Sequence, residues 1–299
     1  MSYPGYLRLF ETGELQNRVD RLYEIAESCT LCPHKCGIDR RRVADGTCES
    51  RLAPIVSSWG PHFGEERPLV GKHGSGTIFL TNCNLKCVFC QNYDISQMGN
   101  GKEIDCDELA NIMLSLQRRG CHNINFVTPT HMVPAISRAL IAAVPKGLSV
   151  PLIYNSGGYD DVETLKLLDG IFDIYMPDFK YADEEIAEKL SAAPDYPGIA
   201  AAALREMHRQ VGDLETDTFG VAKRGLLVRH LVLPDSLAGS KKVIDFIASL
   251  SKNTYLNLMD QYRPVFRAKR HEGLGRHVTF QEFDETVAYA RRTGIRRLD

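Results

Sequence analysis

The chain has 299 residues, of which 43% are hydrophobic and 25% are charged, and its formal net charge is −2. This length suffices for one large α/β domain or two ordinary ones, whereas the nearly neutral charge gives no electrostatic reason to expect a nucleic-acid partner. Because the longest apolar runs, such as residues 139–144, are too short to span a bilayer and the start shows no charged-then-apolar leader, we expect a cytoplasmic protein without a membrane partner.

Cysteine is the residue type with the most informative distribution. Seven of the nine cysteines fall into two tight groups, at positions 29, 32, 36 and 48 and at positions 83, 87 and 90. A secreted disulfide scaffold would be smaller and would spread its cysteines along the chain. Grouped cysteines therefore indicate metal binding, while the isolated Cys106 and Cys121 are expected to be small buried residues.

The first 75 residues differ in character from the rest. They contain a predicted helix near 14–28, the first cysteine group and a segment rich in Gly, Pro and His at 59–76. We predict an N-terminal extension, residues 1–75, that packs on a main domain formed by residues 76–299.

The first cysteine group offers four thiolates, enough for a tetrahedral zinc ion or an iron-sulfur cluster. Its members are Cys29, Cys32, Cys36 and Cys48. The spacing lacks the usual ferredoxin run, so we expect a structural metal site, with zinc slightly ahead of a second cluster. Free cysteines in a reducing cytoplasm are the remaining alternative.

Between this group and residue 76 lie His62, Glu65 and Glu66. The paired carboxylates could position a substrate amine or alcohol, but a solvated turn is the favoured interpretation. The stretch Gly74-Ser-Gly76 precedes a predicted strand, whereas a dinucleotide fingerprint follows one, so it is not a nucleotide motif.

From residue 76 onward, β-rich runs alternate with amphipathic helical stretches, which is typical of a parallel sheet built from βα units. The predicted strands are 76–82, 123–129, 150–156, 171–179, 225–234 and 254–262. The predicted helices are 106–119, 132–143, 160–169, 183–193, 197–211, 240–251 and 280–293, the last opening with a capping box at Thr279 and Glu282. Six strands in about 220 residues predict a partial (β/α)6 barrel, since a full eight-stranded barrel needs about 250.

The second cysteine group, Cys83-x3-Cys87-x2-Cys90, directly follows the first strand of this barrel. Three thiolates leave one iron of a four-iron cluster open for another ligand. A zinc site would need a fourth ligand at finger-like spacing, and none follows. The carboxyl ends of barrel strands are where functional residues gather.

This motif, with Phe89 before the last cysteine, resembles the signature of the radical S-adenosylmethionine superfamily. The resemblance implies a 4Fe-4S cluster on Cys83, Cys87 and Cys90, S-adenosylmethionine on the open iron, and a contact from Phe89. It also implies a one-electron donor such as flavodoxin or ferredoxin, and a 5′-deoxyadenosyl radical that abstracts hydrogen from the substrate.

The fourth predicted strand turns polar at its end, where period two places Met176, Asp178 and Lys180 on one face. An ion pair at the rim is the alternative. The stretch 176–180 also resembles one in glycyl-radical activating enzymes such as pyruvate formate-lyase activating enzyme. There the Met and Asp help to hold a monovalent cation against the cofactor carboxylate, and the Lys lies in the same pocket.

Asn155 and Ser156 end the third strand, where the activating enzymes complete the cation site with an Asp-Thr pair. Asn155 removes one formal charge, which puts the cation, though not the cofactor, in doubt. An ordinary turn is the alternative. Arg229 lies in the fifth strand and needs a partner such as a carboxylate. Its alignment with the activating enzymes implies a cofactor contact, whereas His230 is expected to pack against a helix.

The end of the second strand departs from the family pattern. The family usually carries Gly-Gly-Glu there, which binds the cofactor amino group, and this chain has Thr128, Thr130 and His131 within residues 126–131. Backbone carbonyls and threonine hydroxyls could accept the same hydrogen bonds. His131 is expected either to cap the next helix or to act in catalysis.

The composite of both cysteine groups resembles uncharacterised homologues of the activating enzymes over nearly the whole chain. The leading hypothesis is an activating-enzyme-like oxidoreductase that abstracts hydrogen, with a glycine of a partner protein as the favoured target. Radical modification of a peptide or small metabolite is one alternative, and an electron-transfer or carrier protein that does not cleave the cofactor is another. The motifs specify neither the substrate nor a catalytic residue beyond the cofactor ligands.

Overall fold

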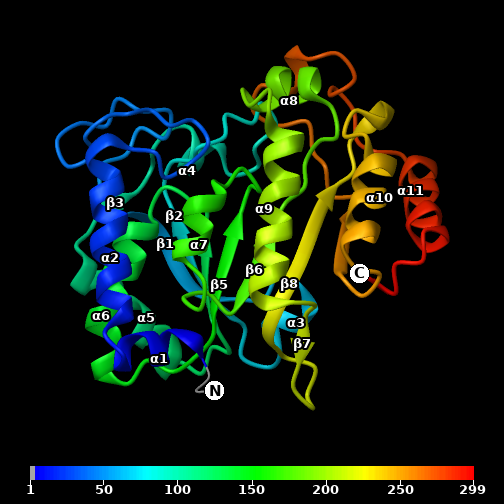
Figure 1. Cartoon of the computed structure of the whole chain (residues 1–299). Coiled ribbons are helices and arrows are strands. Elements are labelled where there is room, and N and C mark those ends of the chain that lie inside the picture. Colours follow the sequence, from blue (N-terminus) through cyan, green and yellow to red (C-terminus); the bar gives the residue numbers. More distant parts are fainter. Residues whose placement is uncertain (1–3) are drawn as a thin grey trace.

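The structure, a computed structural model, describes residues 4–299 as alternating helices and strands (Figure 1). The helices are α1 (Gly5–Glu11), α2 (Glu14–Ile25), α3 (Arg67–Val70), α4 (Tyr93–Ser96), α5 (Cys106–Arg118), α6 (Val133–Ala143), α7 (Val162–Leu167), α8 (Glu184–Ser191), α9 (Tyr196–Val211), α10 (Ser240–Leu250) and α11 (Phe280–Arg292). The strands are β1 (Ile55–His62), β2 (Ser75–Leu80), β3 (Lys102–Glu103), β4 (Ile124–Val127), β5 (Leu152–Ser156), β6 (Ile174–Pro177), β7 (Glu215–Thr216), β8 (Ala222–Leu231), β9 (Tyr255–Met259) and β10 (Arg297–Leu298).

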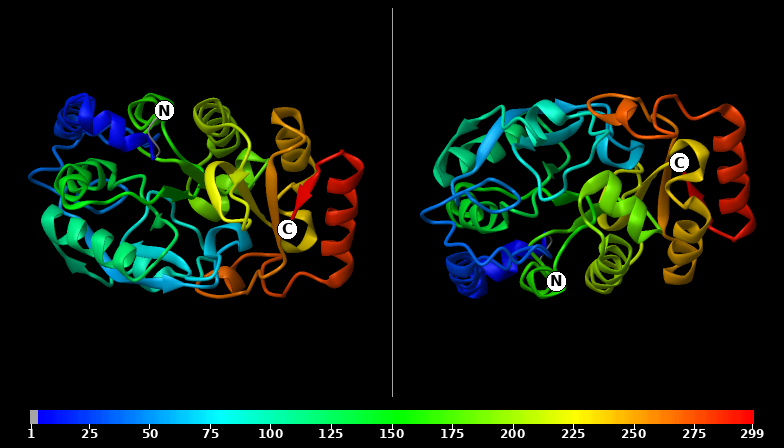
Figure 2. Two further views of the ribbon diagram at one scale, coloured as in Figure 1. Left: turned by 90° about the horizontal axis from the view of Figure 1, so that it is seen from below. Right: turned by 90° about the horizontal axis from the view of Figure 1, so that it is seen from above.

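One ten-stranded sheet runs through the molecule in the order β10-β9-β8-β6-β5-β4-β2-β1-β3, and β7 pairs with β8 beside this path. Strands β2, β4, β5, β6, β8 and β9 run parallel to one another. The sheet is curved with helices on its outside, and its two end strands do not pair with each other (Figure 2). The predicted partial (β/α)6 barrel is therefore confirmed.

All six predicted strands and the seven predicted barrel helices are present, with differences at their ends. Strand β6 is shorter than the predicted 171–179 because Pro177 has no N–H to donate, and Asp178 joins the sheet only through a single bridge to Arg229. Helix α7 begins at Val162 rather than 160 because Asp161 is its N-cap. The predicted capping box at the start of α11 is confirmed.

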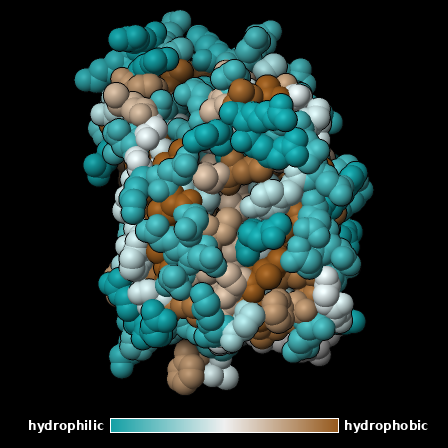
Figure 3. Space-filling model, turned by 90° about the vertical axis from the view of Figure 1, so that its left-hand side faces the viewer, coloured by the Kyte–Doolittle hydropathy of each residue, from teal (hydrophilic) through white to brown (hydrophobic). Residues whose placement is uncertain are grey.

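Several elements were not predicted from the sequence, and some of them lie before residue 76. Strand β1, which was not predicted, pairs antiparallel with β2, whereas the helix predicted near 14–28 is present as α2 and packs on α6. The division of the chain at residues 75 and 76 stays a prediction. The side of the molecule that carries α2 and α6 is mostly hydrophilic, with small apolar groups between the polar ones (Figure 3). No helix within residues 4–299 is long and apolar enough to cross a membrane.

The parallel strands divide their side chains between two apolar clusters. On β5, Leu152 and Tyr154 pack in the large cluster with the covering helices, whereas Ile153 packs with Met176 of β6 in a smaller cluster. Leu69 of α3 belongs to this smaller cluster, and the Asn123 side chain donates to its carbonyl at 2.8 Å. The segment between β1 and β2 therefore lies against the inner face of the sheet.

Candidate functional site

The second cysteine group lies on a loop that leaves the carboxyl end of β2. Cys87 Sγ lies 3.0 Å from Ser191 Oγ, and Cys90 Sγ lies 3.1 Å from Ser96 Oγ. Together with Cys83, these cysteines line one cavity of about 140 Å³ at the carboxyl edge of the sheet. The structure thus brings the three predicted thiols together.

The environment of these thiols fits a cluster better than a single metal ion. Burial raises the pKa of Cys83 to about 12 and also raises the pKa of Cys87, so both stay protonated unless a metal displaces the proton. In residues 4–299 no three His, Cys, Asp or Glu side chains converge as ligands of one ion would. A four-iron cluster instead binds each thiolate at a separate iron.

A network of charged groups forms the wall opposite the thiols. Arg229 donates from Nε to Asp178 Oδ1 at 2.9 Å and from Nη2 to Asn155 Oδ1 at 2.8 Å. Lys180 Nζ lies 2.5 Å from Asp178 Oδ2. The three charged side chains are 14–19% exposed, so they are not an exposed rim pair.

The cations of this wall keep Asp178 ionised. Burial by itself would raise the pKa of Asp178, but Arg229 and Lys180 lower it below its ordinary value, so Asp178 is a carboxylate at neutral pH. Arg229 and Lys180 share this carboxylate, and Glu66 Oε1 lies 3.9 Å from Arg229 Nε. The two cations are the groups here that could bind the carboxylate of an amino-acid ligand.

The end of β5 is held by a residue that sequence reasoning missed. Asp160 is 1% exposed and accepts hydrogen bonds from Ser156 at 2.6 Å, Thr130 at 2.7 Å and Tyr154 at 2.8 Å. Only its position shortly after a strand could have indicated this role. Ser156 lines the cavity, but its hydroxyl donates to Asp160, so the pair fixes the loop after β5.

Gly158 makes the close packing of this loop possible. Its φ is +78°, and a Cβ there would lie 2.1 Å from the carbonyl oxygen of Asp178. The turn-forming residues after Asn155 therefore allow this close packing, in addition to the hydrogen bond that Ser156 makes.

Two of the predicted cofactor contacts do not line the cavity. The ring of Phe89 is buried and meets Tyr262 and Tyr181 edge to face at 5.8 and 6.4 Å. Met176 is fully buried and belongs to the apolar cluster below the cavity. Their contacts with the cofactor stay predictions, whereas Asn155, Ser156, Asp178, Lys180 and Arg229 all line the cavity.

The end of β4 contributes an unusual backbone conformation. Thr128 lines the cavity with a φ of +63°, which is rare for a β-branched residue. Its amide donates to Asn155 O at 2.9 Å. Thr130 is engaged with Asp160, so Thr128 is the threonine available on this side.

His131 takes neither of the two roles expected for it. Helix α6 has no side-chain N-cap, and His131 does not line the cavity at the carboxyl edge. Its Nε2 lies 2.9 Å from Thr81 O, and burial lowers its pKa to about 3, so it is neutral. His230 packs as expected, since its nitrogens lie 2.6 Å from Phe179 O and 2.8 Å from Ser240 Oγ.

The expectation that Glu65 and Glu66 form a solvated turn is wrong. Their side chains are 8% and 5% exposed, because the segment containing them lies against the inner face of the sheet. Glu65 Oε1 lies 3.0 Å from His62 Nδ1, and Glu66 Oε1 accepts from Asn257 at 3.0 Å. Glu66 lies 3.9 Å from Arg229 Nε, and its Oε2 has no partner among the described residues.

The first cysteine group is also brought together. Its four cysteines line one small cavity beside Arg40 and His131. Cys106 is half-buried near Tyr23, and Cys121 is buried, so both lie apart from the two groups.

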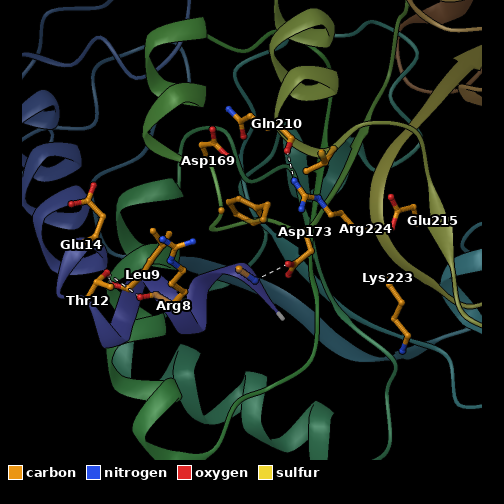
Figure 4. Close-up of a pocket in the computed structure, with 14 residues that line it drawn as sticks. Arg8, Leu9, Thr12, Glu14, Asp169, Asp173, Gln210, Glu215, Lys223 and Arg224 are labelled. Carbon is orange, nitrogen blue, oxygen red and sulfur yellow. Dashed lines mark hydrogen bonds between the residues drawn. The ribbon is translucent and has the colours of Figure 1, made fainter. Parts of the chain in front are cut away.

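A larger cavity of about 820 Å³ lies at the opposite edge of the sheet, near the start of β6 and β8 (Figure 4). Asp173 accepts there from the Gly5 amide at 2.9 Å, and Arg224 donates to the carbonyl of Gln210. Both cationic and anionic side chains line it together with apolar ones, and none of the predicted site residues is present. The cavity lined by Cys83, Cys87 and Cys90 is therefore the stronger candidate for the catalytic site.

Comparison with known proteins gives two matches. The family model described as the Radical SAM superfamily matches residues 77–220, which begin in β2 and include the second cysteine group. An uncharacterized protein of Methanocaldococcus jannaschii is 33% identical over 291 residues, covering 94% of this chain and 79% of that protein.

Proposed function

Because the chain belongs to the radical S-adenosylmethionine superfamily, we propose that it is a member of the activating-enzyme type, which abstracts hydrogen from a glycine of a partner protein. The observation that carries this proposal is the cavity that the three thiols share with Asp178, Lys180 and Arg229. When bound, the 4Fe-4S cluster and S-adenosylmethionine supply a one-electron cleavage that yields a 5′-deoxyadenosyl radical.

The chain's own residues bind the cluster and orient the cofactor. Cys83, Cys87 and Cys90 hold the cluster, and Arg229 with Lys180 attracts the cofactor carboxylate toward the wall. The oxygens of Asp178 are already paired with these two cations. We therefore infer that the side chains supply the charge that a monovalent cation provides in the activating enzymes.

The substrate class rests on the resemblance and on one contact. The buried, unpartnered Oε2 of Glu66 supports a substrate that presents a hydrogen-bond donor to this oxygen, beside Arg229. A peptide or small metabolite with such a donor is the second candidate. Flavodoxin or ferredoxin as electron donor and a cytoplasmic location belong to the same proposal.

The first test is quantification of 5′-deoxyadenosine after anaerobic reconstitution with iron and sulfide, reduction with dithionite and addition of S-adenosylmethionine. We expect product from the wild type and from Cys121→Ala, a buried cysteine outside the site, and none from Cys87→Ala. A wild-type cluster that forms without any deoxyadenosine would instead favour an electron carrier.

The second test addresses the charged wall. Arg229→Gln removes the cation that pairs with Asp178, so we expect the affinity for S-adenosylmethionine to fall by about tenfold to a hundredfold. Equilibrium binding to the reconstituted protein measures this, with iron content as the check that the cluster is intact. Unchanged affinity would remove Arg229 from the cofactor site.

A further inference from the structure

The first cysteine group lies at the same end of the molecule as the radical-cluster loop. In Figure 1 the N-terminal loop in dark blue is at the top, at the end to which the arrowheads of the parallel strands point. The cavity lined by Cys29, Cys32, Cys36 and Cys48 is also lined by Leu31, Ile38, Arg40, Gly46 and His131. Four thiols around a small, mainly apolar cavity form a soft donor set.

His131 supplies an independent indication of a ligand. It is 1% exposed, and its Nε2 faces the carbonyl oxygen of Thr81, which can only accept, so Nε2 carries the ring proton. Its Nδ1 therefore presents a lone pair, and this atom has no partner among the described residues. An unpartnered buried polar atom on a residue that lines the thiol cavity calls for a partner that the described residues do not supply.

The spacing of the thiols favours a cluster over a zinc ion. In the described part of the chain no three potential ligands converge on one point, although a tetrahedral zinc site requires this. The thiols of Cys83, Cys87 and Cys90 likewise do not converge on one point, and their family uses them for a cluster. Four cysteines would fill all four irons and leave none for S-adenosylmethionine.

Direct contacts join the two cysteine loops. His34, between Cys32 and Cys36, lies with Nε2 2.7 Å from Asn84 O, next to Cys83. The side chain of Asn82 donates to Glu49 O at 3.0 Å, and Lys86 Nζ lies 2.9 Å from the Glu49 carboxylate.

A second path runs through the buried arginine. Arg40 donates from Nη1 to His131 O at 2.7 Å, and the His131 ring is hydrogen-bonded to Thr81, two residues before Cys83. Segment 29–50 thus contacts residues 81–86 at several points.

We propose that Cys29, Cys32, Cys36 and Cys48 bind an auxiliary 4Fe-4S cluster, and that this cluster holds the segment 81–86 in place for the radical cluster. Because all its irons have protein ligands, it does not cleave the cofactor. Its function is to order the loop that carries Cys83.

The test uses the triple variant Cys83→Ala/Cys87→Ala/Cys90→Ala, which lacks the radical cluster. After anaerobic reconstitution we expect about four irons and four sulfides per chain, compared with about eight irons in the wild type. Adding Cys32→Ala/Cys36→Ala should abolish this binding, whereas adding Cys106→Ala/Cys121→Ala should not. One zinc without sulfide, or no metal, in a folded triple variant would overturn the assignment.

If the triple variant does not fold, the iron content and Mössbauer spectrum of Cys32→Ala/Cys36→Ala test whether the first cysteine group binds a cluster. Half the wild-type iron content with one cluster type supports the proposal, and the full wild-type iron content contradicts it.

The ordering function is tested by hydrogen exchange. Exchange in segment 81–86 should slow on the order of tenfold when the triple variant is loaded with its cluster, with α11 as the reference. Equal exchange with and without the cluster would overturn this function. Neither readout depends on deoxyadenosine formation.

Discussion

At the scale of single residues, buried polar side chains decide what the site can bind. Asp178 has both oxygens paired with cations, and Asp160 receives three hydroxyl donors. Glu66 Oε2 and both side-chain polar atoms of Asn125, by contrast, have no partner in residues 4–299. Because an unpartnered buried polar group costs about 1–3 kcal/mol, a ligand or water that bonded to these atoms would stabilise the protein.

Thr128 gives a test at this scale. Its left-handed backbone disfavours a β-branched residue by about 1–2 kcal/mol, so Thr128→Gly should raise the free energy of unfolding by up to about 1 kcal/mol after the flexibility of glycine is subtracted. Thr128→Val keeps the branching and should give no such gain, while both variants lose the hydroxyl and weaken cofactor binding. Urea denaturation and equilibrium binding measure the two effects, and a destabilised glycine variant would refute the strain.

At the scale of elements, caps and proline fix where helices and strands begin and end. Asp161, Asp183 and Thr279 each accept from backbone amides at the first turn of a helix. These side chains satisfy amides that have no partner within the helix, which is why helix starts were predicted closely. Short elements such as α3 and β3 have no such signal and were missed.

Helix α11 gives the test for capping. Thr279→Ala removes the acceptor for the Glu282 amide, which lies 3.2 Å from Thr279 Oγ1, so the free energy of unfolding should fall by about 1 kcal/mol. Thr279→Ser keeps the hydroxyl and serves as the matched control. Thermal and urea unfolding should separate the two variants, and equal stabilities would show that the cap contributes little.

At the scale of the whole molecule, the two edges of the sheet are occupied differently. The carboxyl edge carries both cysteine groups, and at the other edge helix α1 docks through the Gly5 amide on Asp173. Burial raises the pKa of Asp173 to about 7, although the amides of Gly5 and Leu152 and the charge of Arg224 lower it. An acid with a raised pKa keeps its proton in the folded state while the unfolded chain has lost it.

The pH dependence of stability follows from this difference. Between pH about 4 and pH about 7 the folded state binds one more proton than the unfolded state, so the contribution of Asp173 to stability falls as pH rises through this window and is constant above it. Asp173→Asn does not titrate. The difference in unfolding free energy between wild type and variant should therefore change between pH 5 and pH 8 in favour of the variant at high pH. Parallel pH profiles would contradict the shifted pKa.

The sequence by itself determined the alternation of strands and helices, the partial barrel and the loop that carries Cys83, Cys87 and Cys90. These features depend on local periodicity and on ligand spacing, both of which are written along the chain. Only the tertiary structure decided that β1 joins the sheet, that Glu65 and Glu66 are buried, and that Asp160 and His131 face hydroxyls and thiols from distant segments. Such contacts join residues separated by tens of positions, and neither periodicity nor spacing reports which segments the closing of a curved sheet brings together.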